Sequence, residues 1–199
     1  MKSDAAIYLF QQARAVACNL RGITVTDPWY FEGGNITKAG SIVEHRHTMQ
    51  AVLQGIREAG GQCPSLLGGG HITQSREGWV RQGERTLTLG KGVCTDCAAA
   101  AAVRFLKVAN ASKYLARVEI LSTGWHAFVL VNRQGSLKAC ERWGEGAFVL
   151  DIWYQNQFPM NQVSGAFWVS DHTHPTMKNI VDARHCLRVE VVFQKGFGD

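Results

Sequence analysis

The chain has 199 residues, of which 46% are hydrophobic and 19% charged, with a formal net charge of +5. This length and composition are typical of one globular domain, so we expect residues 1–199 to form a single domain. Lysines and arginines are dispersed rather than in runs, which predicts no nucleic-acid partner, and no apolar run approaches the roughly 20 residues that span a bilayer.

The first half of the chain predicts helices joined by glycine-rich loops. Residues 1–22 form an amphipathic pattern with Ser3 or Asp4 as the N-cap and Gly22 at its end, and because acidic and glutamine residues interrupt it we expect no secretory signal peptide. A capping box of Ser41 and Glu44 starts a second predicted helix, which Gly60–Gly61 ends. The glycine-dense segment 60–78 predicts a long loop.

The second half predicts one helix followed by strands. The alanine-rich run from Cys94 to Asn110 has helical spacing. Short apolar runs then predict strands at 114–121, 126–133, 136–143, 147–154 and 186–193, with a hairpin-type turn at 132–135 and Leu187, Val189, Val191 and Phe193 on one face of the last strand. Helices early and an antiparallel sheet late indicate an α+β fold, with a helical, loop-rich part over 1–90 and a helix packed on the sheet over 91–199.

Cys94 and Cys97 begin the alanine-rich helix. The six cysteines are irregularly spaced, and we expect them to be free thiols. A helix N-terminus and a neighbouring histidine both favour a thiolate. Cys94 lies at the helix start, whereas Cys97 lies one turn inside it among alanines, so Cys94 is the better candidate for a nucleophile.

His126 and Asp151 are the candidate partners of this thiol. His126 opens a strongly apolar strand, and Asp151 follows an apolar run where a lone carboxylate is costly to bury. We expect His126 to move the proton and Asp151 to orient the imidazole. The main-chain N–H of Cys94 is the predicted oxyanion donor. A second donor is left open among Gln74, Trp79 and Gln82, and Trp125 and Trp153 are candidate walls of a substrate channel.

The motifs resemble a family. Cys-x-Asp-x-Ala at a helix start, His-Ala-Phe opening a strand and a later aspartate before an aromatic residue are similar to the core of transglutaminase-like, papain-type cysteine enzymes, over residues Lys91–Tyr154. Small domains of bacterial effectors and toxins, which act on host proteins and serve virulence, resemble it most. Ile152 stands where their pattern often has proline, and Asp27 is a rival acid that precedes the cysteine, against the family order.

The resemblance implies a papain/transglutaminase-like fold and thioester chemistry on a protein carboxamide, with no metal or other cofactor. Glutamine deamidation of a partner protein, possibly a host protein, is the favoured reaction; transglutamination shares its thioester, and a cysteine peptidase is the alternative. The non-enzymatic alternative is a binding module held by zinc through Cys94 and Cys97, with His172, His174 and the His185–Cys186 pair as possible further ligands. We expect a cytoplasmic location, or delivery into a target cell by a specialised secretion system.

Overall fold

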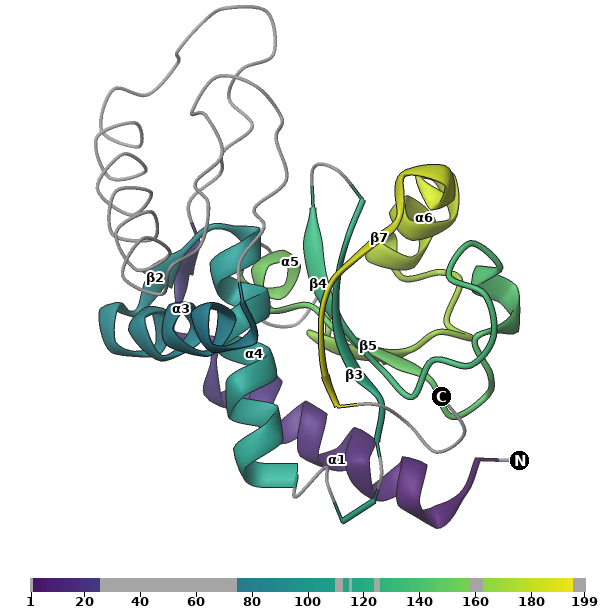
Figure 1. Cartoon of the computed structure of the whole chain (residues 1–199), viewed down its shortest axis with the longest axis horizontal. Helices are drawn as coiled ribbons and strands as arrows, with labels where there is room; N and C mark the ends of the chain where they lie inside the picture. The colour runs from purple at the N-terminus through teal and green to yellow at the C-terminus, as the bar shows by residue number, and fades with distance from the viewer. Residues whose placement is uncertain are drawn as a thin grey trace, which may run out of the picture.

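Helices cover both faces of one antiparallel sheet (Figure 1). The structure is a computed structural model that describes residues 2–25, 75–109, 113–114, 116–123, 126–157 and 163–194. The helix predicted over 41–59 lies outside these ranges. Within them, the elements are α1 (Asp4–Asn19), β1 (Thr24–Val25), α3 (Arg76–Leu89), β2 (Lys91–Gly92), α4 (Cys94–Ala109), β3 (Val118–Ser122), β4 (Ala127–Val131), β5 (Phe148–Leu150), α5 (Ile152–Gln157), β6 (Ala166–Trp168), α6 (Pro175–Asp182) and β7 (Arg188–Gln194), with short 3-10 turns at Cys140–Arg142 and Arg184–Cys186.

The main sheet has five strands in the order β6-β5-β4-β3-β7, and every neighbouring pair is antiparallel. The register pairs Val129 with Leu150 and Val131 with Phe148, which brings the start of β4 and the end of β5 to the same end of the sheet. A separate parallel pair joins β1 to β2, just before α4.

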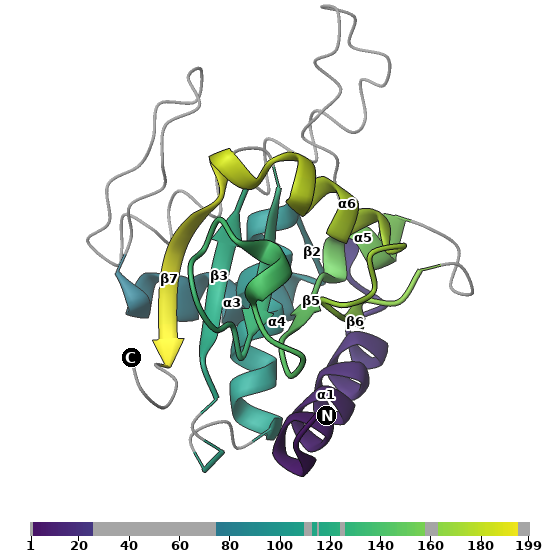
Figure 2. The ribbon, with the colours of Figure 1, turned by 90° about the vertical axis from the view of Figure 1, so that its right-hand side faces the viewer.

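Each face of the sheet buries its own apolar cluster. One cluster joins α1, α3 and α4 to side chains such as Val129, Phe148 and Leu150. The other places Met177 and Ile180 of α6 against alternate residues such as Phe128 and Val149. Figure 2 shows α6 and the β4–β5 connection in front of the sheet, with α3 and α4 behind it. The alternation of side chains along each strand therefore gives the sheet two buried faces.

The helices at 4–19 and 94–109 agree with the prediction, because their caps and apolar spacing are clear. Ser3 is the N-cap of α1 and accepts a hydrogen bond from the Ala6 N–H at 3.2 Å. Helix α3 was not predicted: Ser75 caps it, and it crosses α4 so closely that a Cβ on Gly83 would lie 2.5 Å from the carbonyl oxygen of Ala99. The loop predicted over 60–78 therefore ends before Arg76.

One predicted strand is absent, and the single face predicted for another is wrong. The segment 136–143 is a loop with a 3-10 turn rather than a strand, so the turn at 132–135 opens a long connection from β4 to β5. The last predicted strand is present as β7, but its register against β3 shifts twice, and Leu187, just before β7, packs into the cluster on the face opposite to that of Phe193. A bulge inserts an extra residue and so changes which side chains share a face.

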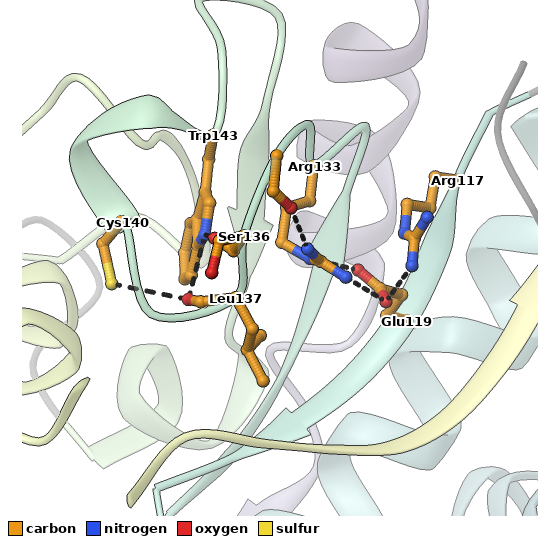
Figure 3. Close-up of polar contacts among 8 residues, drawn as sticks. Arg117, Glu119, Arg133, Ser136, Leu137, Cys140 and Trp143 are labelled. Carbon is orange, nitrogen blue, oxygen red and sulfur yellow. Dashed lines mark hydrogen bonds and ion pairs between the residues drawn. The ribbon is translucent and has the colours of Figure 1, made fainter. Parts of the chain in front are cut away.

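A buried carboxylate ties β3 to the β4–β5 connection (Figure 3). Glu119 accepts two hydrogen bonds from the Arg133 guanidinium, at 2.8 and 2.9 Å, and one from Arg117 at 3.0 Å. Further along the connection, the Trp143 indole N–H donates to the carbonyl oxygens of Ser136 and Leu137, each at 3.2 Å. The long connection is thus held by specific polar contacts, at the end of the sheet opposite the start of β4.

No helix in the described part of the chain is long and apolar enough to cross a membrane.

Candidate functional site

His126 and Asp151 meet at one end of the sheet. His126 directly precedes β4 and Asp151 directly follows β5, so the antiparallel register places the two residues side by side. The His126 Nε2 and the Asp151 Oδ2 lie 2.7 Å apart, and both side chains are buried. The structure therefore pairs two residues that are 25 positions apart in sequence and that the sequence analysis singled out.

Asp151 is also the residue that starts helix α5. Its Oδ1 accepts the Tyr154 N–H at 3.0 Å, the geometry of an N-cap, and its carbonyl oxygen accepts the Gln155 N–H. The strand predicted over 147–154 therefore stops at Leu150. Ile152 is the first residue of α5 and is buried, and this is a helix position that proline also occupies readily. Either residue type is therefore compatible with this helix start.

Thr176, in the first turn of α6, makes a further contact with Asp151. Its Oγ1 donates a hydrogen bond to Asp151 Oδ2 at 2.9 Å, the same oxygen that pairs with His126. Thr176 is not among the residues predicted from the sequence, because helix α6 was not predicted. Pro175, which follows a histidine cap, is the one sequence signal that could have marked this helix start.

Cys94 is the first residue of α4 and lies beside His126. Cys94 and His126 are 6% and 7% exposed, so both sit at the edge of the buried interior. Because Nε2 is paired with Asp151, the buried Nδ1 is the ring nitrogen left to exchange a proton with the thiol. Cys97 is fully buried, and burial, followed by the charges of Asp96, Cys94 and Asp151, raises its pKa well above the usual value. Cys97 is therefore an inert thiol at neutral pH.

The electrostatics favour a charged imidazole. Burial lowers the pKa of His126, but the charge and hydrogen bond of Asp151, together with the proximity of Cys94, outweigh it and raise the pKa to about 10. Burial likewise opposes ionisation of Asp151, yet His126, the Tyr154 N–H and Thr176 together hold its pKa below the usual value. The pair therefore presents an imidazolium beside Cys94.

Asp96 is a second buried carboxylate near the site, and it stabilises the start of α4. Asp96 accepts the Val93 N–H on Oδ2 at 3.0 Å and the Gln82 side-chain amide on Oδ1 at 2.8 Å. Burial raises its pKa to about 6, against these two hydrogen bonds. Gly92 leaves room for it, because a Cβ there would lie 2.5 Å from the Asp96 Cβ. Asp96 lies three residues after Val93 and accepts its N–H, which is one of the two contacts of a capping box. This spacing is the sequence signal that could have identified Asp96.

The remaining sequence candidates are placed as follows. Gln74, Trp125 and the rival acid Asp27 lie outside the described residues. The Gln82 amide is engaged with Asp96, whereas the buried Trp79 Nε1 has no hydrogen-bond partner within the described structure. Trp153 is half-buried, and its ring lies 5.2 Å from the His126 ring, tilted by 48°. Trp153 therefore borders the histidine directly.

The described residues do not supply the set of ligands that the alternative of a zinc-bound binding module requires. Within them, no three side chains of His, Cys, Asp or Glu gather so that they could hold a metal ion. His174 instead caps α6, with Nδ1 accepting the Thr176 N–H. The described cysteines 18, 94, 97, 140 and 186 are free thiols.

Comparison of the chain with protein-family models, with curated proteins and with solved structures finds no match.

Proposed function

We propose that this protein is a cysteine acyl-transfer enzyme of the papain/transglutaminase-like kind, which acts through a thioester on a carboxamide of a partner protein. The observation that carries the proposal is the placement of His126 between the Asp151 carboxylate and Cys94 at the N-terminus of α4. A nucleophile, a proton carrier and an orienting acid in contact are the recurring arrangement for acyl transfer.

The chemistry follows from these three groups. The Cys94 thiolate attacks the carboxamide carbon, and the oxyanion that forms is stabilised by the partial positive charge at the start of α4, with the Cys94 N–H as donor. His126 gives its proton to the leaving nitrogen, the C–N bond breaks, and a thioester remains. Water, deprotonated by His126, then attacks the thioester, the C–S bond breaks, and a carboxylate and the thiol are released.

Deamidation of a glutamine side chain is the reaction we favour, because the motifs resemble those of effector domains that act on host proteins. The same thioester can also pass to a lysine amine or arise from a peptide bond, so the products distinguish deamidase, transglutaminase and peptidase. Incubation with a blocked glutamine peptide should release ammonia, and added hydroxylamine should trap the thioester as a hydroxamate. Cleavage of a protein substrate without ammonia would favour the peptidase instead.

Alkylation of the native protein tests the nucleophile itself. Iodoacetamide should modify Cys94 rapidly below pH 7, and Cys97 should stay unmodified because it is buried with a raised pKa. His126→Ala should slow the Cys94 reaction by about 10- to 100-fold at pH 6, since the thiolate loses its ion-pair partner. Each modified cysteine is located by mass spectrometry.

The matched control is Cys97→Ala, which should leave the Cys94 rate unchanged. Equal, slow modification of Cys94 with and without His126 would exclude the thiolate–imidazolium pair and the proposed chemistry with it.

A further inference from the structure

Asp151 accepts hydrogen bonds from three separate segments of the chain. His126 and Thr176 both reach Oδ2, at 2.7 and 2.9 Å, and the Tyr154 N–H reaches Oδ1 at 3.0 Å. The Tyr154 contact caps α5, so it fixes the backbone around the carboxylate. The Thr176 hydroxyl has a different role, because it shares the oxygen that faces the imidazole.

Thr176 is held rigidly in this place. It is 0% exposed, and its N–H donates to the Nδ1 of His174 at 3.2 Å. The other ring nitrogen of His174 bonds the Ser164 carbonyl oxygen at 2.9 Å, and the ring stacks on Phe167 with 3.5 Å between centroids. His174 thus has both ring nitrogens engaged as a neutral donor–acceptor, and it orients the first turn of α6.

The same short segment before β6 also supports Asp151. The Asp151 N–H donates to the Gly165 carbonyl oxygen at 2.7 Å, next to the Ser164 carbonyl that holds His174. The donor hydroxyl and the acceptor carboxylate are therefore fixed to adjacent peptide units. These contacts fix the direction in which Asp151 Oδ2 faces the His126 ring.

We propose that Thr176 is a positioning residue of the site, which aims the Asp151 carboxylate at the His126 Nε2 and so fixes the imidazole that serves Cys94. Its catalytic meaning rests on the function proposed above. A hydroxyl that donates to the oxygen shared with the imidazole stabilises the ionised carboxylate and stops it from rotating. Without the hydroxyl, Asp151 would keep its negative charge less readily at acid pH and would hold the ring in more than one orientation.

Thr176→Val and Thr176→Ser separate the hydroxyl from the packing. Valine keeps the branched shape and removes the donor, whereas serine keeps the donor. We expect Thr176→Val to slow Cys94 alkylation at pH 6 by about tenfold, the size expected for one hydrogen bond to a charged group, and to move the acid limb of its pH profile towards neutrality. Thr176→Ser should retain the wild-type profile.

The matched control is Thr173→Val, three residues before Thr176 in the loop that leads into α6. It removes another threonine hydroxyl that donates to an aspartate, Asp171, at 2.6 Å, on the exposed surface. This variant should leave the alkylation profile unchanged. All variants are compared after thermal unfolding has shown that each one is folded at the temperature of the assay.

A second readout does not depend on activity. In NMR spectra, the resonance of the His126 Nε2–H should shift in Thr176→Val and stay at its wild-type position in Thr176→Ser and Thr173→Val. If wild-type Cys94 shows no fast, pH-dependent alkylation, the proposed function fails, yet this resonance still decides the role of Thr176. An unchanged resonance and pH profile in Thr176→Val, or a serine variant as impaired as the valine variant, would overturn the inference.

Discussion

His126 is a buried side chain that carries a charge. Its pKa is raised from 6.5 to about 10: burial lowers it, but Asp151 and Cys94 raise it more. The folded protein therefore binds a proton on His126 over a pH range in which the unfolded chain releases it. The stability from this charge is fully present below pH 6.5 and is lost as the pH rises through about 10.

The upward shift of the His126 pKa on folding predicts how the stability of His126→Gln differs from that of the wild type. The difference in free energy of unfolding between the two proteins should be largest between pH 5 and 6.5 and should shrink steadily towards pH 10. Urea unfolding of both proteins at matched pH values measures the difference, and the titration of groups that do not interact with His126 cancels. A difference that stays constant across this range would show that folding leaves the pKa of His126 at its value in the unfolded chain.

Asp96 destabilises the fold in its charged form, whereas the charged form of His126 stabilises it. Burial raises its pKa from 3.8 to about 6, so the folded state binds a proton that the unfolded chain lacks between these values. Its contribution to the free energy of unfolding therefore rises as the pH falls from 7 to 4, by up to ~3 kcal/mol. The charged, buried Asp96 lowers the free energy of unfolding at neutral pH. We therefore infer that Asp96 serves another purpose, which is to hold the start of α4 through its contacts with Val93 and Gln82.

Asp96→Asn should remove this pH dependence and stabilise the protein at pH 8 by about 1–3 kcal/mol, because the amide oxygen still accepts the Val93 N–H without a buried charge and the Gln82 amide can turn over to accept from the new NH2. Urea unfolding at pH 4.5 and pH 8 measures both effects. If the variant and the wild type changed in parallel between these pH values, Asp96 would not be the titrating group.

At the scale of single residues, the sequence identified only part of the site. Cys94, His126 and Asp151 were found because each stands where an element begins or ends, and those positions are visible in a sequence. Thr176 was missed, and Gln82 was named only as a possible oxyanion donor rather than as a partner of Asp96, because these contacts join different elements of the fold. Their side chains are ordinary until the fold places a carboxylate beside them.

Helix α3 shows why an element can escape prediction. Its buried residues are Gly78, Trp79, Gln82, Gly83 and Thr86, which are mostly small or polar. Apolar periodicity, the main sequence signal of an amphipathic helix, is therefore weak along it. Strand β6 and helix α6 were missed for another reason: they have three and eight residues, too few for a pattern to emerge.

The crossing of α3 over α4 predicts an unusual effect for Gly83→Ala. Alanine in place of glycine within a helix normally stabilises by about 1 kcal/mol. Here the new Cβ would lie 2.5 Å from the Ala99 carbonyl oxygen, which is backbone and cannot yield, so the helices must separate. We expect a net loss of about 1–3 kcal/mol in the free energy of unfolding.

Gly22→Ala is the control for this prediction, since a Cβ there meets no atom within 4 Å. Thermal or urea unfolding of both variants gives the comparison. A Gly83→Ala protein as stable as the wild type would mean that α3 can shift away from α4 without loss of packing.

Across the whole molecule, Gln155 connects the site to the N-terminal helix. Its side-chain amide donates to the Ala17 carbonyl oxygen at 2.8 Å, and its Oε1 accepts the Gly165 N–H at 3.0 Å. Gly165 in turn accepts the Asp151 N–H. One buried amide therefore joins α5 and the nearby segment before β6 to α1, at a residue 138 positions earlier in the chain.

Gln155→Leu should destabilise the protein by about 2–4 kcal/mol, because it leaves a carbonyl oxygen and an N–H buried without partners. It should also slow Cys94 alkylation, since the support of Asp151 is loosened. Gln11→Leu, on the exposed surface of α1, is the control and should change neither quantity. Urea unfolding and alkylation rates measured on the same samples test both expectations, and a stable Gln155→Leu protein would contradict them.

The pairing of β7 with β3 has a consequence for how the chain is made. The ribosome releases α4, β3 and β4 well before α6 and β7, so Cys94 and His126 emerge while Thr176 is still missing and one edge of β3 has no partner. Open apolar edges invite aggregation during synthesis. A chain truncated before Arg188 would retain all three proposed catalytic residues and yet expose Val118–Ser122, so we expect it to depend on chaperones and to collect in inclusion bodies.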